Sequence, residues 1–395
     1  MEWAYVRLSD VMTGYDRFTF DDGLEPILNA IQSRHHQAAL RIHVDYPGQA
    51  SGVPPFLLDA GVQLKPYTVF GGGLCPDYRD PRLLSALNQF VRAFGERYDG
   101  DPRIGFITAG LVGFWGEWHT YPYNGHDDPE DWMPSRDEQE RLLRAYVDAF
   151  SKTKVLVRYP TAGSPALPMG YHDDSFAYST IGTRSYDFIR LLEEAGELDK
   201  WKKEPIGGEL RPELQNGIWT DLPPDEAQDY DASVQATHAS WLINQGVFRT
   251  EFPAQGPDYE RALAGHVRLG YELHVAEVRW WLSRTGLAIE IDVFNRGVAP
   301  FYYDWPIELA LWDRRTGQIV FREWTDWHLS TVLPSATATV WHHEMTWAVG
   351  DRDAFQILMR GINPMPGGRP LGFANQEQDR DVLGWLSLAE MVNRA

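Results

Sequence analysis

The chain has 395 residues, of which 43% are hydrophobic and 23% are charged. This apolar fraction is large enough for a packed core, and the length suggests two or three domains. The 36 basic residues (Lys and Arg) and 56 acidic residues give a formal net charge of −20 at pH 7. Because nucleic acids and anionic lipid surfaces attract basic proteins, we expect neither nucleic acid nor a membrane as a partner.

The rest of the composition narrows the chemistry further. A single cysteine, Cys75, excludes an intrachain disulfide and a cysteine-based zinc site. The 16 Trp, 18 Tyr and 18 Phe residues are typical of proteins that stack aromatic rings on sugars, although aromatic side chains also fill large cores. Residues 1–6 carry neither the basic nor the apolar segment of a secretion signal. We therefore expect a cytoplasmic protein, or a secreted one whose leader is absent from this chain.

Over residues 1–265 short apolar strands alternate with amphipathic helices. The expected strands are residues 4–8, 38–44, 62–67, 104–114, 155–159, 175–179, 206–210 and 240–244. In the helices between them apolar residues recur at spacings of three and four, and one helix follows a capping box of Ser135 and Glu138. This alternation predicts a parallel sheet with crossover helices. About seven such units without a glycine-rich dinucleotide motif favour a (β/α)8 TIM-type barrel, which we expect to be the catalytic domain.

From residue 266 the apolar pattern has a period of two. Leu287, Ile289, Ile291 and Val293 show this alternation, and residues 313–317 have the composition of a hairpin turn. Further strands are expected at residues 307–311, 318–321, 337–341, 355–359 and 382–386. Short strands separated by turns predict an antiparallel, Ig-like β-sandwich at residues 266–395, after the barrel at residues 1–265.

Polar residues stand at the ends of the predicted barrel strands, where TIM barrels place their active sites. Glu117 follows a long uncharged strand and lies between Trp115 and Trp118 in the sequence. Neighbouring indole rings remove water from a carboxyl group and favour its protonated form, which a general acid needs near neutral pH. Glu209 ends a later strand and is the natural second member of the carboxylate pair that cleaves glycosidic bonds.

Each of these carboxylates also has a purely structural interpretation. Glu117 could bind only a neighbouring loop or Arg158, and Glu209 could form only an ion pair with Arg41 or Arg211. The sequence contains no G-x-S-x-G motif, which disfavours serine-hydrolase chemistry.

Other polar and aromatic residues stand at the same strand ends. We expect the following residues to bind sugar hydroxyls or to stack on sugar rings: Arg41, His43, Asp45, Trp115, Trp118, His119, Arg158, His172, Asp173 and Trp241. Three groups of histidines and acidic residues are also possible ligands of a divalent metal: His43 with Asp45, Glu117 with His119, and His172 with Asp173 and Asp174. None has a tight ligand spacing such as H-E-x-x-H, so we expect no metal and no other cofactor.

Three runs of residues carry a resemblance to a known family. They are Arg-x-His-x-Asp-Tyr-Pro-Gly at residues 41–48, Gly-Glu-Arg-Tyr-Asp-Gly-Asp-Pro at residues 95–102, and Gly-Leu-Val-Gly-Phe-Trp-Gly-Glu-Trp-His at residues 110–119. The chain resembles an uncharacterised bacterial family of glycoside-hydrolase-like proteins, defined by a domain of unknown function. The resemblance covers nearly the whole chain and implies a TIM barrel followed by a β-sandwich.

The chain is more distantly similar to the clan A glycoside hydrolases. That similarity implies an acid/base Glu at the end of the fourth barrel strand and a nucleophilic Glu at the end of the seventh, which Glu117 and Glu209 match. Trp241 is similar to the clan's eighth-strand Trp, whereas Gly116 stands where those enzymes usually have Asn. With Glu117 after the fourth strand, residues 4–8 become the second strand, and residues 62–67 fall outside the barrel. The first strand is then expected upstream of Met1.

The leading hypothesis is a glycoside hydrolase in which Glu117 protonates the glycosidic oxygen and Glu209 attacks the anomeric carbon. A non-catalytic glycan-binding barrel protein and a metal-dependent hydrolase are the alternatives. In each of the first two cases the partner is a carbohydrate. The sequence leaves the sugar, the linkage, the stereochemical outcome and the oligomeric state open.

Overall fold

The computed structural model describes residues 1–124, 131–284, 286–347 and 354–391. The chain divides into two compact units, the first formed by residues 1–237 and 241–263 and the second by residues 238–240 and 264–395. In the described part of the chain no helix is long and apolar enough to cross a membrane.

A parallel sheet of seven strands forms the centre of the first unit, in the order β1-β4-β7-β8-β9-β10-β11. These strands are β1 (Glu2–Arg7), β4 (Ala38–His43), β7 (Ile104–Thr108), β8 (Val155–Val157), β9 (Gly170–Phe176), β10 (Ile206–Leu210) and β11 (Trp241–Ile243). The sheet is curled, because Trp3 on the first strand and Trp241 on the last have ring centroids only 5.6 Å apart. The predicted parallel sheet is therefore confirmed as a half-barrel, and its strands follow one another in chain order.

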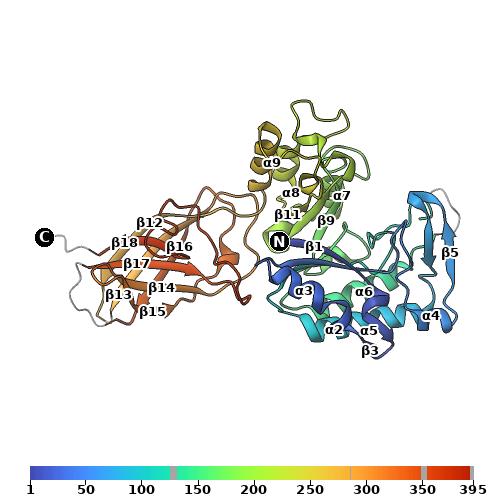
Figure 1. The fold of residues 1–395 in the computed structure, drawn as a ribbon, viewed down its shortest axis with the longest axis horizontal. Helices are drawn as coiled ribbons and strands as arrows, with labels where there is room; N and C mark the ends of the chain where they lie inside the picture. Colours follow the sequence, from blue (N-terminus) through green and yellow to red (C-terminus); the bar gives the residue numbers. More distant parts are fainter. Residues whose placement is uncertain (125–130, 285, 348–353, 392–395) are drawn as a thin grey trace. The chain divides into compact units, whose positions relative to one another are not determined.

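Helices cover the outer face of this sheet (Figure 1). The α-helices are α1 (Leu8–Val11), α2 (Phe20–Gly23), α3 (Glu25–Gln32), α4 (Pro55–Asp59), α5 (Pro81–Tyr98), α6 (Arg136–Ala149), α7 (Phe188–Ala195), α8 (Tyr230–Thr237) and α9 (Pro257–Val267). Phe90 and Phe94 on α5 and Leu143 on α6 are fully buried in the core between helices and sheet. The predicted capping box begins α6, since Ser135 and Glu138 each accept a hydrogen bond from the other's backbone N–H.

Short elements complete the first unit. They are the strands β2 (Met12–Gly14), β3 (Arg17–Phe18), β5 (Leu64–Tyr67) and β6 (Gly73–Pro76), and the 3-10 helices η1 (Val69–Gly71), η2 (Ser164–Ala166), η3 (Lys200–Lys202), η4 (Pro212–Leu214), η5 (Gly217–Trp219) and η6 (Gly246–Phe248). β5 pairs antiparallel with β6 and lies outside the parallel sheet. This agrees with the expectation that residues 62–67 are not part of the barrel.

Several strand predictions were wrong in their bounds. In the second unit, the strand expected at residues 382–386 is β18 (Leu386–Glu390), and the strand expected at residues 337–341 is β16 (Thr339–Met345). Two errors lie in the first unit. β7 ends at Thr108 rather than at residue 114, because a run rich in glycine folds into a loop directly after it. The strand expected at residues 175–179 is β9, which ends at Phe176. Ala177 then takes a left-handed conformation with φ of 60°, and Tyr178 and Ser179 donate backbone hydrogen bonds back to Ser175.

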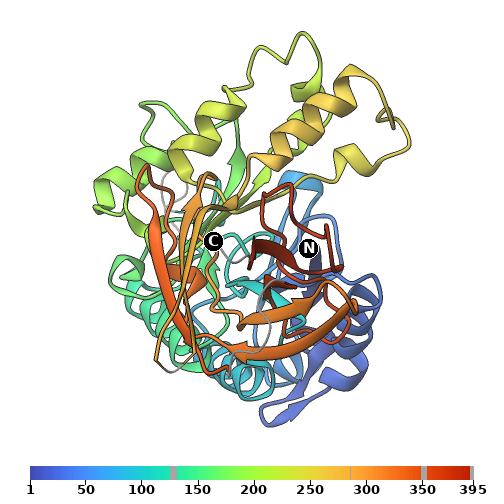
Figure 2. The same cartoon turned by 90° about the vertical axis from the view of Figure 1, so that its left-hand side faces the viewer.

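The second unit contains two antiparallel sheets, whose strands face the viewer in orange and red in Figure 2. One has the order β12-β13-β16 and the other β15-β14-β17-β18. The strands are β12 (Leu273–Leu282), β13 (Leu287–Asn295), β14 (Ile307–Asp313), β15 (Gln318–Trp324), β16 (Thr339–Met345), β17 (Phe355–Gly361) and β18 (Leu386–Glu390), and a 3-10 helix, η7 (Leu329–Thr331), precedes β16. Ile289 from one sheet and Leu309 from the other belong to one hydrophobic core. The predicted period of two and the hairpin turn between residues 313 and 318 are thus confirmed.

Candidate active site

The loop of residues 109–120, here the Glu117 loop, follows β7 and folds tightly on itself. Gly113 and Gly116 have φ of +83° and +72°, a region that side chains with a Cβ rarely adopt. A Cβ on Gly116 would overlap the carbonyl oxygen of Gly110. The position before Glu117 therefore has room for glycine alone, which explains why this chain has no Asn there.

Two tryptophans in the same loop are held in a strained conformation. Trp115 and Trp118 have φ of +52° and +57°, a backbone strain that costs roughly 1–3 kcal/mol per residue and is concentrated at functional sites. Residues that follow β8 hold this loop in place. The Tyr159 hydroxyl donates to the carbonyl oxygen of Trp118 at 3.0 Å, and Arg158 Nη1 donates to that of Glu117 at 3.4 Å.

Glu117 forms a buried ion pair with Arg41 on β4. Arg41 Nη1 lies 3.0 Å from Glu117 Oε1, and the arginine is fully buried while the Glu117 side chain is 10% exposed. The guanidinium of Arg41 also stacks over the Trp3 ring at 4.9 Å. The other carboxylate oxygen, Oε2, lies 3.6 Å from His119 Nε2. Glu117 is therefore fixed by a buried cation at one carboxylate oxygen and faces His119 with the other.

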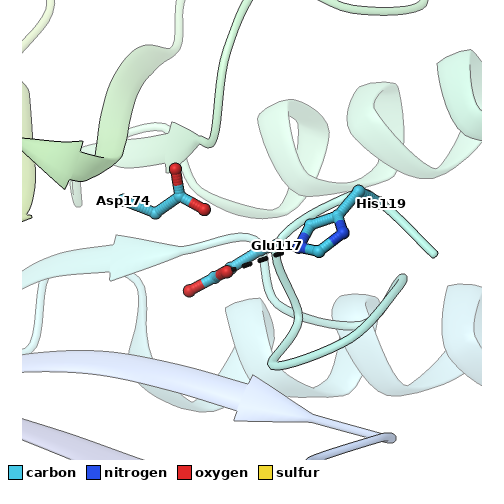
Figure 3. A group of neighbouring side chains, drawn as sticks. All are labelled: Glu117, His119 and Asp174. Atoms are coloured by element: carbon cyan, nitrogen blue, oxygen red, sulfur yellow. Dashed lines mark ion pairs between the residues drawn. The ribbon is translucent and has the colours of Figure 1, made fainter. Parts of the chain in front are cut away.

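Asp174 on β9 points its carboxylate toward Glu117 from the other side, as Figure 3 shows. One ligand atom from each of Glu117, His119 and Asp174 lies within 4.8 Å of the other two. Asp174 Oδ2 accepts from Arg158 Nε at 2.7 Å. Burial raises the pKa of Asp174 to about 6 even though Arg158 opposes the rise, and the charge of Glu117 adds to it.

Glu209 near the end of β10 is the second buried carboxyl group, with 8% of its surface exposed. Burial raises its pKa to about 8, and the negative charge of Glu117 is the next cause. Glu117 is thus near enough to influence the ionisation of Glu209, and the raised pKa favours the protonated form of Glu209 at neutral pH.

Three histidines at or below this cluster are uncharged at pH 7. Burial, followed by the charge of Arg158, lowers the pKa of His119 to about 3. Burial, followed by the charge of Arg41, lowers the pKa of His43 to about 4. His172 is fully buried, and its pKa lies well below the usual range for the same reason. Neutral imidazoles both donate and accept hydrogen bonds, as binding of sugar hydroxyls requires.

The group of Glu117, His119 and Asp174 contains the ligand types that divalent cations prefer. Both carboxylates, however, already have an arginine partner, Arg41 at 3.0 Å and Arg158 at 2.7 Å. A cation would have to displace these two guanidinium groups or share the carboxylates with them. We therefore assign no metal to this group.

The structure brings several predicted site residues together around Glu117 and Glu209. Arg41, Trp115, His119 and Arg158 contact the Glu117 loop or belong to it. His43 packs at the same end of β4, with its ring centroid 5.3 Å from that of Tyr46.

His172 and Trp241 lie deeper in the curled sheet. Both pair in register with Gly207, which lies two residues before Glu209 on β10 and therefore on the same face of the sheet. Their rings are 5.5 Å apart, and both pack against Trp3. A Cβ on Gly207 would overlap the Trp241 indole, so this glycine makes room for the ring. These two residues therefore lie nearer the start of the strands than the carboxyl group of Glu209.

Three predicted site residues have side chains that bond other partners than the two carboxyl groups. Trp118 is only 2% exposed, and its indole N–H donates to the carbonyl oxygen of Ala109 at 2.6 Å. Trp118 therefore packs in the hydrophobic core of the first unit. Asp45 accepts from the Tyr67 hydroxyl at 2.7 Å, next to the hairpin of β5 and β6. Asp173 accepts from the Thr180 hydroxyl at 2.6 Å.

The sequence predicted Asp174 only as a possible metal ligand, and it did not predict Trp3 or Tyr5 as site residues. Neighbours on a strand point to opposite faces, so Asp174 shares the inner face with His172, whereas Asp173 points to the other face. The spacing of two between His172 and Asp174 was the available signal. Trp3 and Tyr5 have the same spacing on β1, and both lie against the Arg41 guanidinium.

No family model and no curated protein matches the chain. The resemblance to an uncharacterised family therefore stays a prediction. Among solved structures the chain is similar to endo-glycoceramidase II from Rhodococcus sp., with 13% identity, a TM-score of 0.37, and coverage of 85% of this chain and 87% of that chain. It is also similar to xylanase 10B from Thermotoga petrophila RKU-1, with 10% identity, a TM-score of 0.33, and coverage of 65% and 81%.

A third similar structure is a beta-glucanase from Saccharophagus degradans, with 11% identity, a TM-score of 0.28, and coverage of 58% of this chain and 68% of that chain. TM-scores of this size carry no argument about this chain. Its function has to be inferred from the residues of the site themselves.

Proposed function

We propose that the first unit is a glycoside hydrolase that cleaves a glycosidic bond with Glu117 and Glu209. One observation carries this proposal: two buried carboxyl groups follow or end strands of one curled parallel sheet, one of them ion-paired with a buried arginine and the other with a raised pKa. Glu117 is ion-paired with the buried Arg41, whereas burial keeps a proton on Glu209 at neutral pH. A proton donor beside an anion is what hydrolysis of a glycosidic bond requires.

The same surroundings favour roles opposite to those expected from the sequence. Glu209 donates its proton to the glycosidic oxygen as the bond from that oxygen to the anomeric carbon breaks. Glu117, held as an anion by Arg41, either attacks the anomeric carbon or accepts a proton from the attacking water. In the first case the Glu209 carboxylate then accepts the proton of the water that releases the sugar.

Aromatic and polar side chains around the pair suit a carbohydrate substrate. Trp115 and Phe70 have ring centroids 5.0 Å apart, and Phe70 is 48% exposed, so together they offer an aromatic wall to a sugar ring. We assign hydroxyl binding to Arg158 and the neutral His119, which are partly exposed beside Glu117. We also propose that the second unit is an Ig-like β-sandwich at residues 266–395, since its two antiparallel sheets share one hydrophobic core.

Substitution of the two carboxyl groups tests the proposal. With a panel of 4-nitrophenyl glycosides, Glu117→Gln and Glu209→Gln are expected to lower kcat/KM by about 10²-fold or more, because each removes one partner of the acid–base pair. Glu213→Gln is the matched control, since Glu213 follows β10 but is exposed and paired with Arg211 on the surface. Full activity of either test variant would contradict the proposal. Wild-type protein that binds sugars in calorimetry without releasing reducing ends would instead indicate a glycan-binding protein.

A further inference from the structure

Tyr5 lies on the inner face of the curled sheet, and the chemistry proposed above does not use it. On β1 it pairs in register with Arg41 of β4, the residue that holds the Glu117 carboxylate. Register partners in a parallel sheet point to the same face, so the phenol and the guanidinium extend to the same side. The Cζ atom of Arg41 lies 5.6 Å from the centroid of the Tyr5 ring. Tyr5 is therefore a direct neighbour of the ion pair in the site.

The strand register also places Tyr5 at the level of Glu209. Trp3, two residues before Tyr5, packs against Trp241 with ring centroids 5.6 Å apart, and Trp241 pairs with Gly207. Glu209 lies two residues after Gly207, just as Tyr5 lies two residues after Trp3. Because the strands are parallel, a step of two residues moves both positions in the same direction and keeps them on the same face. Tyr5 and Glu209 therefore stand at one level of the curled sheet.

The electrostatics of the phenol agree with this placement. Burial raises the pKa of the Tyr5 hydroxyl above its usual range, the charge of Arg41 opposes the rise, and the charges of Glu209 and Glu117 add to it. Both carboxyl groups therefore act on this hydroxyl, which keeps its proton at neutral pH.

The Tyr5 hydroxyl has a proton to donate. It accepts a hydrogen bond from Arg41 Nη1 at 3.5 Å, and among the described residues the structure shows no acceptor for its own proton. The oxygens of Glu117 already lie beside other groups, Oε1 at 3.0 Å from Arg41 Nη1 and Oε2 at 3.6 Å from His119 Nε2. A hydroxyl that accepts from a cation becomes a stronger donor. The proton is therefore available to an oxygen of a bound ligand.

Three aromatic rings hold the phenol in place. Trp3, His43 and Tyr46 pack edge-on against the Tyr5 ring, with centroid distances of 5.3, 6.0 and 5.3 Å. These contacts fix the direction in which the hydroxyl is presented. The side chain is partly exposed, so a ligand in the site can reach it.

We infer that Tyr5 is a further substrate-binding residue, whose hydroxyl donates a hydrogen bond to one hydroxyl oxygen of the sugar ring that lies between Glu117 and Glu209. The inference rests on the proposed function for the position of that sugar. It also restricts the substrate class to sugars that carry an oxygen at the contacted position, because a site built to bind a hydroxyl rejects the analogue that lacks it. Tyr5 itself forms and breaks no covalent bond to the substrate.

Tyr5→Phe removes the hydroxyl and keeps the ring. With the 4-nitrophenyl glycoside that the wild type hydrolyses fastest, kcat/KM is expected to fall by about 10-fold or more, because one hydrogen bond to the substrate is lost. Tyr171→Phe is the matched control, since the hydroxyl of Tyr171 on β9 donates to Glu197 at 3.2 Å, away from the two carboxyl groups. The kcat/KM of that variant is expected to equal the wild-type value.

Glycosides of the same sugar that each lack one hydroxyl group separate binding from a structural role. The ratio of wild-type to Tyr5→Phe kcat/KM cancels the intrinsic reactivity of each glycoside. This ratio is expected to be about 10 or more for the parent and for every deoxy glycoside except one, and about 1 for that one, because neither protein can then form the bond. An equal ratio for every glycoside would overturn the inference by showing that the hydroxyl serves the structure alone.

A second readout does not depend on turnover. In protein labelled with ¹³C at tyrosine Cζ, the Tyr5 signal (identified by its loss in Tyr5→Phe) is expected to shift when glucose, galactose, mannose or xylose is added singly, with at least one of them effective. The Tyr171 signal is expected to stay in place. A shift of Tyr5 in a protein without glycosidase activity would support the inference and refute the proposed function. Glycoside hydrolysis without any shift of Tyr5 by the released sugar would overturn the inference and leave the proposed function standing.

Discussion

Glu209→Gln is expected to make the protein more stable at neutral pH while lowering its activity on substrates whose leaving group must be protonated. Burial raises the pKa of Glu209 from its ordinary value of 4.5 to about 8. The unfolded chain ionises this carboxyl near pH 4.5, whereas the folded chain keeps it protonated until about pH 8. The stability that the protonated group provides is therefore fully present below about pH 4.5 and is lost as the pH rises to about 8.

The size of the effect follows from that difference in pKa. At about 1.4 kcal/mol per pH unit, the wild-type protein loses up to about 5 kcal/mol of unfolding free energy over this interval. Glutamine has nearly the same shape and does not ionise. The variant should therefore match the wild type near pH 4.5, exceed it by about 3 kcal/mol at pH 7, and exceed it by up to about 5 kcal/mol at pH 8.5.

Urea unfolding of both proteins at pH 4.5, 6, 7 and 8.5, followed by far-UV circular dichroism, measures this difference. Taking the difference between the two proteins cancels the titration of other buried acids such as Asp45 and Asp173. A stability difference that does not change between pH 4.5 and pH 8.5 would refute the reasoning, because it would mean that Glu209 ionises alike in the folded and unfolded chain.

Three further substitutions test other contacts of the site. Arg41→Met leaves Glu117 buried without its cation, so urea unfolding at pH 7 should show a loss of about 3–5 kcal/mol; unchanged stability would show that the ion pair is not needed. Gly116→Ala forces a methyl group against the Gly110 carbonyl and displaces Glu117, so kcat/KM should fall by about 10-fold or more; unaltered kinetics would mean that the loop tolerates a side chain there. Phe70→Ala removes half of the aromatic wall, so KM should rise about 2- to 10-fold with kcat preserved; an unchanged KM would place the sugar elsewhere.

Much of the fold could be predicted because local periodicity reports it. The switch from helical spacing to a period of two marks the change from the parallel sheet to the antiparallel sheets. The capping box of Ser135 and Glu138 and the turn at residues 313–317 are formed by neighbours in sequence, so they could be found without the tertiary structure. The end of β7 could not be found in this way, since the apolar residues after Thr108 pack in a buried loop rather than in a strand.

The sequence positions of the two carboxyl groups could be predicted, but the residues that they contact could not. Acidic residues after strands of a parallel sheet point to its active edge, which selected Glu117 and Glu209. The partner of Glu117 is Arg41, a residue 76 positions away in the sequence, and no spacing rule identifies such a contact. The protonation of Glu209 depends on burial by side chains from several strands. The sequence favoured Asp173 over Asp174 because it does not show which residues of β9 point inward. This strand is largely buried on both faces, so polar and apolar residues do not alternate along it.

The dependence of kcat/KM on the leaving group tests the central claim most directly. A 2,4-dinitrophenyl glycoside departs without protonation, whereas a 4-methoxyphenyl glycoside needs a proton donor. Glu209→Gln is expected to hydrolyse the dinitrophenyl glycoside nearly as fast as the wild type and to lose activity on the methoxyphenyl glycoside. Glu117→Gln is expected to lose activity on both substrates. Activity of Glu117→Gln on the dinitrophenyl glycoside would contradict the assigned roles. Failure of the wild-type protein to hydrolyse either glycoside, with any sugar tested, would contradict the claim that it is a glycoside hydrolase.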